Sequence, residues 1–97
     1  PQSFAYQMAV ADIAEIYLAL DRPHDALENG EELLRLSNED PTVVAQAKFI
    51  VARAEWRTKG DRDRARRLAS EAATAYADVS GLEVQLAEVR AWQDAHP

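Results

Sequence analysis

The chain of 97 residues contains no cysteine. This absence excludes disulfides, zinc sites built on thiolates and cysteine nucleophiles, and it is compatible with a reducing compartment, so we expect a cytoplasmic protein. No apolar run reaches the length of a membrane span and no secretory signal is visible, so no membrane partner is expected. The length allows one domain, 1–97. The missing initiator methionine indicates a piece of a longer protein or a processed product.

Positive charge is also scarce, because 11 Lys and Arg stand against 17 Asp and Glu and give a formal net charge of −6. This balance argues against general nucleic-acid binding. The bases are nevertheless concentrated in one basic segment, which holds Arg53, Arg57, Lys59, Arg62, Arg64, Arg66 and Arg67. Acids alternate with them, so the segment is either a solvated turn or a patch for regulatory docking to an acidic partner.

Glycine and proline are few, at three and four residues, and apolar residues recur at helical spacing through most of the chain. This periodicity predicts five α-helices, over residues 3–20, 23–37, 41–58, 62–78 and 81–95. The start signals agree, since Ser3, Asp40 and Asp61 are good N-cap residues and Pro23 suits a first helical position. Ser80–Glu83 has the sequence of a capping box and is expected to open the last helix.

The first predicted helix is apolar on almost every side, since only Gln7, Asp12 and Glu15 are polar among residues 4–20. A helix on the surface of a bundle needs only one apolar stripe. We therefore expect a second neighbour to cover it, either an upstream helix of a longer array or the same helix of a second copy in a homodimer. The last helix, with a polar outer side, suits the end of an array.

A helix–turn–helix unit occurs twice in the chain. Tyr17 and Ala26 are nine residues apart, as are Trp56 and Ala65, so the two units align with a shift of 39. A recurring helical hairpin predicts a stacked helical array.

The third predicted helix, 41–58, has two apolar stripes on nearly opposite sides. The first stripe, which is expected to pack on helix 62–78, consists of Ala45, Phe49, Ala52 and Trp56. The second stripe, which suits either a close-packed neighbour or a shallow groove, consists of Val43, Ala47, Ile50 and Ala54.

With the hairpins aligned in this way, the chain resembles the tetratricopeptide repeat (TPR) family over about residues 7–78. The first-helix positions of that family fall on Val10, Ile13, Ala14 and Tyr17, and then on Phe49, Ala52, Arg53 and Trp56. Its small second-helix residue falls on Ala26 and Ala65. The chain departs from the family pattern at Gly30, Asn38, Arg53 and Ala69, and its repeat spacing is longer than the family's.

The resemblance implies two TPR-like repeats and a capping helix stacked as a short all-α superhelix. It also implies non-catalytic binding of a protein or peptide in a concave groove. The groove would be lined by Met8, Ala11, Glu15, Leu18, Ala47, Ile50, Ala54 and Arg57. The alternative is that these side chains form interhelix core. Ala11 and Glu15 stand where the family's carboxylate clamp has Lys and Asn, so that clamp is missing. An apolar segment or helix with one basic contact would suit Glu15 better.

A further likeness is carried by residues 53–81 and 86–92, which are similar to C-terminal repeat regions of large bacterial serine/threonine kinases and related signalling proteins. No kinase motif lies in the chain itself. This likeness implies a place in bacterial signalling.

Few residues in the chain could carry chemistry. His24 and His96 lie at a helix start and beside the last residue, with no convergent acid, so they are interpreted as surface groups and not as metal ligands. The serines lack a paired base, the glycines are isolated, and adjacent acids such as Glu31 and Glu32 diverge around a helix. We expect no enzymatic activity, no cofactor and no metal.

The sequence as a whole predicts a non-catalytic protein–protein interaction module that forms the C-terminal end of a longer repeat array. Two alternatives stay open. The chain could be a homo-oligomerisation domain that pairs through helix 3–20, or it could dock an acidic partner or nucleic acid through the basic segment Arg53–Arg67.

Overall fold

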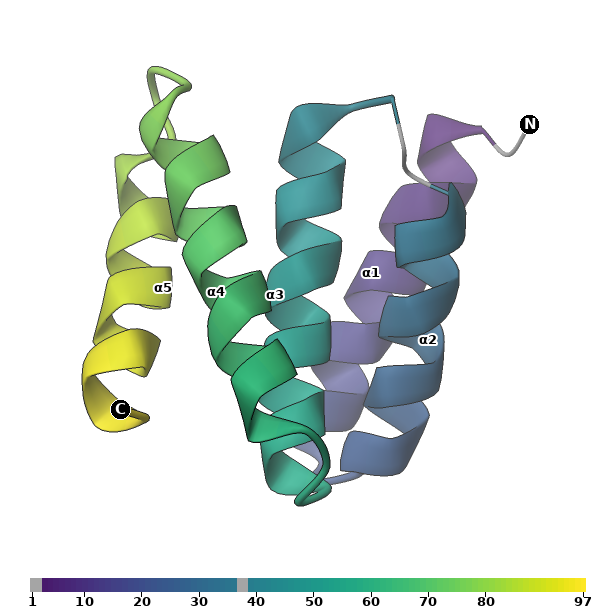
Figure 1. The fold of residues 1–97 in the computed structure, drawn as a ribbon. Coiled ribbons are helices and arrows are strands. Elements are labelled where there is room, and N and C mark those ends of the chain that lie inside the picture. Colours follow the sequence, from purple (N-terminus) through teal and green to yellow (C-terminus); the bar gives the residue numbers. More distant parts are fainter. Residues whose placement is uncertain (1–2, 37–38) are drawn as a thin grey trace.

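The computed structural model describes residues 3–36 and 39–97, which form helices joined by short turns (Figure 1). The helices are α1 (Phe4–Ala19), α2 (Pro23–Leu36), α3 (Pro41–Arg57), α4 (Arg62–Ala77) and α5 (Glu83–Ala95). The described residues contain no strand, so the predicted all-α class is confirmed. Ser37 and Asn38, which include the predicted end of the second helix, lie outside the described residues.

Three of the helices begin at the predicted N-caps. The side chain of Ser3 accepts a hydrogen bond from the backbone N–H of Tyr6 at 3.2 Å. Asp40 accepts from the N–H of Thr42 at 2.9 Å, and Asp61 accepts from that of Arg64 at the same distance. These carboxylates satisfy N–H groups that have no partner inside the helix, which fixes the first turns of α3 and α4.

The start of α5 differs from the prediction. The helix begins at Glu83, two residues later than expected, and its N-cap is Leu82, which makes no side-chain capping bond. Gly81 has a φ of 91°, a left-handed conformation that turns the chain before the helix can start. The carboxylate of Glu83 does reach back, to the N–H of Gly81 at 3.2 Å. Ser80 is therefore not the N-cap, because the Gly81 turn separates it from the helix.

The helices pack against their neighbours in chain order, and α1 also packs against α3. In Figure 1 they form a row that runs from α5 at one edge, through α4 and α3, to the α1–α2 hairpin at the other. Such a row has two ends, unlike a bundle that closes around one axis. Five large apolar side chains of the first hairpin remain exposed: Phe4, Tyr6, Ile13, Ile16 and Leu20.

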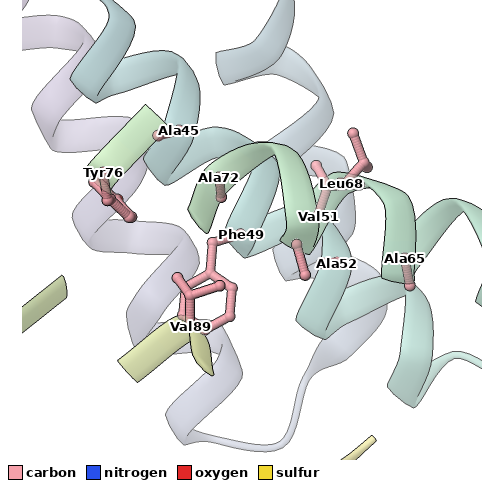
Figure 2. Packing of buried hydrophobic residues seen from close by; sticks show 10 residues of the cluster. Ala45, Phe49, Val51, Ala52, Ala65, Leu68, Ala72, Tyr76 and Val89 are labelled. Atoms are coloured by element: carbon pink, nitrogen blue, oxygen red, sulfur yellow. The ribbon is translucent and has the colours of Figure 1, made fainter. Parts of the chain in front are cut away.

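Both predicted stripes of α3 are confirmed. The first stripe joins a buried cluster with Ala65, Leu68 and Ala72 of α4 and with Val89 of α5 (Figure 2). The residues of the second stripe pack against α1 and α2 and are at most 2% exposed. Of the two readings of that stripe, the close-packed neighbour is therefore correct.

The two hairpins share one turn geometry. Asp21 and Lys59 are both left-handed, with φ of 57° and 59°. The next residue in each turn donates its backbone N–H to the carbonyl five positions earlier. Arg22 donates to Tyr17 at 2.8 Å, and Gly60 donates to Glu55 at 3.0 Å. Because these bonds lie 38 residues apart, Tyr17 corresponds to Glu55. The predicted equivalence of Tyr17 and Trp56 is wrong by one residue.

The shift becomes 39 only after the second turn, because that turn holds one additional residue, Gly60, before the N-cap Asp61. Beyond it, Ala26 of α2 and Ala65 of α4 do correspond, and both are fully buried. In the first helices the 38-residue shift pairs Ala14 with Ala52, which are also fully buried. Each hairpin thus has a fully buried small residue on both of its helices.

Candidate functional site

A cleft of about 170 Å³ opens between α1, α3, α4 and α5. Its lining residues are Glu15, Thr42, Gln46, Phe49, Arg53, Tyr76, Gln85 and Glu88. Four of them come from α3 at intervals of four, three and four positions, which places them on one face of that helix. This face lies between the two apolar stripes, so α3 contributes to the core on two sides and to the cleft on a third.

Arg53 forms the wall of the cleft between α1 and α3. Its guanidinium donates two hydrogen bonds to the carboxylate of Glu15, at 2.8 and 2.6 Å. It also lies over the ring of Phe49, 4.1 Å from the centroid, and its Nε donates to the Phe49 carbonyl at 3.2 Å. A two-pronged ion pair combined with stacking restrains the orientation of the arginine.

Tyr76 supplies a hydroxyl to the cleft from α4. The residue is only 5% exposed, and its side chain makes no hydrogen bond within the described residues. Within the described residues, every fully buried polar side-chain atom has a hydrogen-bond partner. Because the Tyr76 hydroxyl has no partner, it is not fully buried, and solvent reaches it. Its charged neighbours, Arg53, Glu15 and Glu88, all line the cleft. Tyr76 therefore offers an unused donor inside the cleft.

Four more polar residues of the cleft have free side chains. Those of Thr42, Gln46, Gln85 and Glu88 make no hydrogen bond or ion pair within the described part of the chain. The cleft is also lined by the mostly buried rings of Phe49, which Arg53 partly covers, and of Tyr76, and these two rings are its apolar floor. The cleft can therefore accept hydrogen bonds, donate them and pair with one cation, through Glu88.

The hydroxyl of Tyr76 is expected to ionise at a higher pH than free tyrosine. Burial raises its pKa, the charge of Arg53 lowers it in part, and Glu15 and Glu88 raise it further. Since the folded chain holds this proton more tightly than the unfolded chain, stability should fall as pH rises above the ordinary tyrosine range. Ultraviolet titration of the wild type and of Tyr76→Phe isolates the transition. It should move to still higher pH in Arg53→Met, and an unchanged or lower value would contradict this account.

The structure places most of the predicted groove residues elsewhere. Ala11, Leu18, Ala47, Ile50 and Ala54 are between 0% and 5% exposed, so they are interhelix core and are not available to a peptide. Their spacing on α1 and α3 turns them toward neighbouring helices, which is the alternative that the sequence left open.

The other three predicted groove residues have separate positions. Met8 packs half-buried against the cluster of α1, α2 and α3. Arg57 donates to the carbonyl of Leu18 at 2.7 Å. Glu15 does line the cleft, but its carboxylate is already paired with Arg53, so the expected basic contact at Glu15 is not free.

The basic segment does not form one cationic patch. Four of its arginines pair with carboxylates: Arg53 with Glu15, Arg64 with Glu31 and Glu55, Arg66 with Asp63, and Arg67 with Glu71. Arg62 lies over the ring of Trp56, 4.5 Å from its centroid. Helical spacing turns these side chains in different directions, toward α1, α2 and their own helix. Arg53 and Arg64 are partly buried by their ion pairs, whereas the other basic residues of the segment are exposed.

The histidines give no sign of a metal site. His96 stacks on Trp92 with ring centroids 4.3 Å apart, and His24 is exposed at the start of α2. Within residues 3–36 and 39–97, no group of three or more His, Asp or Glu residues converges as metal ligands.

The sequence did not single out Thr42, Gln46, Tyr76, Gln85 or Glu88 as site residues. A signal for the first two does exist, because polar and aromatic residues recur along α3 at positions 42, 46, 49 and 53, between its apolar stripes. For Tyr76, Gln85 and Glu88 no local signal exists, since their position depends on how α4 and α5 pack.

Comparisons of the chain with protein-family models, with curated proteins and with solved structures give no match. Among the described helices, none is both long enough and apolar enough to cross a membrane.

Proposed function

We propose that the protein is a non-catalytic protein-interaction module whose cleft binds an extended segment of a partner protein. The observation that carries this proposal is the set of free polar side chains around the apolar floor of Phe49 and Tyr76. Side-chain amides both donate and accept, as a peptide backbone does, so Gln46 and Gln85 match the N–H and C=O groups of a bound segment. The eight lining residues include no nucleophile–base pair, which favours binding over catalysis.

The charge of the cleft indicates the kind of segment. Arg53 and Glu15 neutralise each other, so Glu88 is the lining carboxylate without a cation. A segment with one apolar side chain for the aromatic floor and one Lys or Arg for Glu88 fits this arrangement. The resemblance to the TPR family supports the same class of function, since two hairpins of matched turn geometry lie side by side in an open row.

A selection of random decapeptides on the full chain tests the proposal. Enriched peptides should carry an apolar residue and a basic residue, and Gln85→Ala should weaken their binding about fivefold or more, as expected when hydrogen bonds to a peptide are lost. Gln93→Ala is a matched control on the same helix, because Gln93 lies outside the cleft and bonds Ser70. Failure to enrich any peptide, or equal effects of the two substitutions, would refute the cleft as the binding site.

A further inference from the structure

The outer face of α1 is a second surface with features of a binding site. Four large apolar side chains are exposed along it, each by 41–61%: Tyr6, Ile13, Ile16 and Leu20. Phe4 is also exposed, but helical spacing places it on another side of α1, and the hydroxyl of Tyr6 donates to Glu32 of α2 at 3.0 Å. Ala5, Ala9 and Ala19 are also exposed. Small residues beside large ones allow another helix to approach closely.

The turn geometry shows what this face corresponds to. The stripe of α3 that packs on α1 and α2 consists of Val43, Ala47, Ile50 and Ala54. The residues 38 positions earlier are Ala5, Ala9, Asp12 and Ile16, all of which are exposed. The face that α3 buries against the first hairpin is thus the face that α1 leaves uncovered. The α3 interface indicates that its complement is helical.

Charge distinguishes the interface between the two hairpins from the uncovered face of α1. The second hairpin supplies the cations that hold it to the first, because Arg53 pairs with Glu15 and Arg64 pairs with Glu31. With the shift of 38 for the first helices, Glu15 of the first hairpin corresponds to Arg53. With the shift of 39 for the second helices, Asp25 corresponds to Arg64. The first hairpin therefore has no equivalent cations to offer a neighbour, and the neighbour must bring its own.

Asp12 indicates where such a cation belongs. Of the two acids on α1, Glu15 is paired with Arg53, whereas Asp12 is exposed and has no ion pair or hydrogen bond within the described residues. Asp12 lies near the middle of α1, among Ala9, Ile13 and Ile16. A carboxylate in the centre of an apolar face is costly to cover unless the covering surface provides a positive charge.

The same residue argues against a second copy of the chain. A two-fold pairing of antiparallel α1 helices brings the middle of one helix against the middle of the other. Asp12 would then face the Asp12 of the other copy, and each copy also carries a net charge of −6. Like charges that meet in a covered interface are unfavourable.

We propose that the outer face of α1 binds an amphipathic helix of a different sequence, whose apolar stripe is interrupted near its centre by a Lys or Arg that pairs with Asp12. This site is separate from the cleft. The Ile16→Glu variant should therefore lose the helix while it still binds the peptides selected on the cleft, so the two proposals can fail independently.

The test is a selection from a library of 18-residue amphipathic helices with randomised stripe positions, on the full chain and on Ile16→Glu. Helices enriched on the wild type should carry Lys or Arg at the central stripe position, and Ile16→Glu should weaken them at least about tenfold. Val84→Glu is the control, because Val84 is 70% exposed on α5, far along the chain from this face. Circular dichroism confirms that both variants fold.

A charge reversal completes the test. The same library on Asp12→Lys should enrich Asp or Glu at the central position, and the wild type should sediment as a monomer at micromolar concentration. Enrichment without a charge bias, or equal enrichment on Ile16→Glu, would overturn the proposal. So would a wild-type dimer that Ile16→Glu dissociates, because the occupant would then be a second copy.

Discussion

Replacing Leu33 with alanine is expected to destabilise the protein by about 3 kcal/mol, within the range of about 2–5 kcal/mol for such core truncations. Leu33 is fully buried on α2, where its side chain packs with Val10 and Ala14 of α1 and with Val43 and Ile50 of α3. Truncation leaves a cavity where three helices meet, and none of them can close it without moving away from another. Urea unfolding followed by circular dichroism measures the loss.

The matched control is Leu20→Ala. Leu20 is 61% exposed at the end of α1, so its truncation should change the free energy of unfolding by less than about 0.5 kcal/mol. Against a total stability of about 5–15 kcal/mol, the Leu33 variant should be close to losing its fold at raised temperature. A loss below about 1 kcal/mol for Leu33→Ala would contradict the three-helix packing.

The helices and both stripes of α3 could be predicted because their signals are local. Apolar spacing determines which side of a helix is buried, and Asp40 and Asp61 mark helix starts through bonds to residues two or three positions away. The local sequence signal fails where the backbone adopts a non-helical conformation inside the motif. Ser80 and Glu83 have capping-box spacing, but the left-handed Gly81 between them delays the helix.

The alignment of the two hairpins could not be predicted, because the second turn holds one additional residue. This residue makes the shift 38 for the helices before the turns and 39 for the helices after them. Gly60 is that residue, and a side chain there would collide with Glu55, whose Oε2 lies 2.1 Å from the position of a Cβ. With the 38-residue shift, the small residue that matches Ala14 is Ala52. Arg53 then no longer stands at the small-residue position of the TPR pattern. It corresponds to Glu15, the residue with which it pairs.

Gly30 is a second position that the sequence could not explain. An aromatic is usual there in the TPR family, but a Cβ at Gly30 would lie 2.9 Å from Cγ2 of Ile50 and from Cγ2 of Val51. The helices α2 and α3 therefore pack too closely for any side chain at this point. Such a distance depends on the packing of the two helices, which periodicity does not report.

The cleft escaped prediction for a similar reason. The stripe of α3 that was assigned to a groove is buried, and the face that carries Gln46 and Arg53 is open. Which side of α3 remains uncovered depends on where α1 and α5 lie, and α5 contributes Gln85 and Glu88 from far along the chain. Helical spacing identifies the faces of a helix, whereas tertiary packing decides which face meets solvent.

Replacing Arg64 with methionine is expected to cost about 2–4 kcal/mol, because it leaves a nearly buried carboxylate without a cation. Arg64 of α4 donates to Glu55 of α3 at 2.8 Å and to both carboxylate oxygens of Glu31 of α2, at 2.7 and 2.9 Å. Hydrogen bonding to Glu31 raises the pKa of Arg64 above its usual value. Methionine keeps the apolar stem, so the change isolates the charge.

The two acids should respond differently when Arg64 is absent. The side chain of Glu55 is only 12% exposed, whereas that of Glu31 is 34% exposed and can be solvated. In the Arg64→Met background, Glu55→Gln should therefore recover about 1 kcal/mol or more, and Glu31→Gln should recover little. Thermal and urea unfolding of the double variants measure this difference. Equal recovery by the two would mean that burial of Glu55 is not what makes Arg64 necessary, and that the arginine acts only as a surface link between α2 and α4.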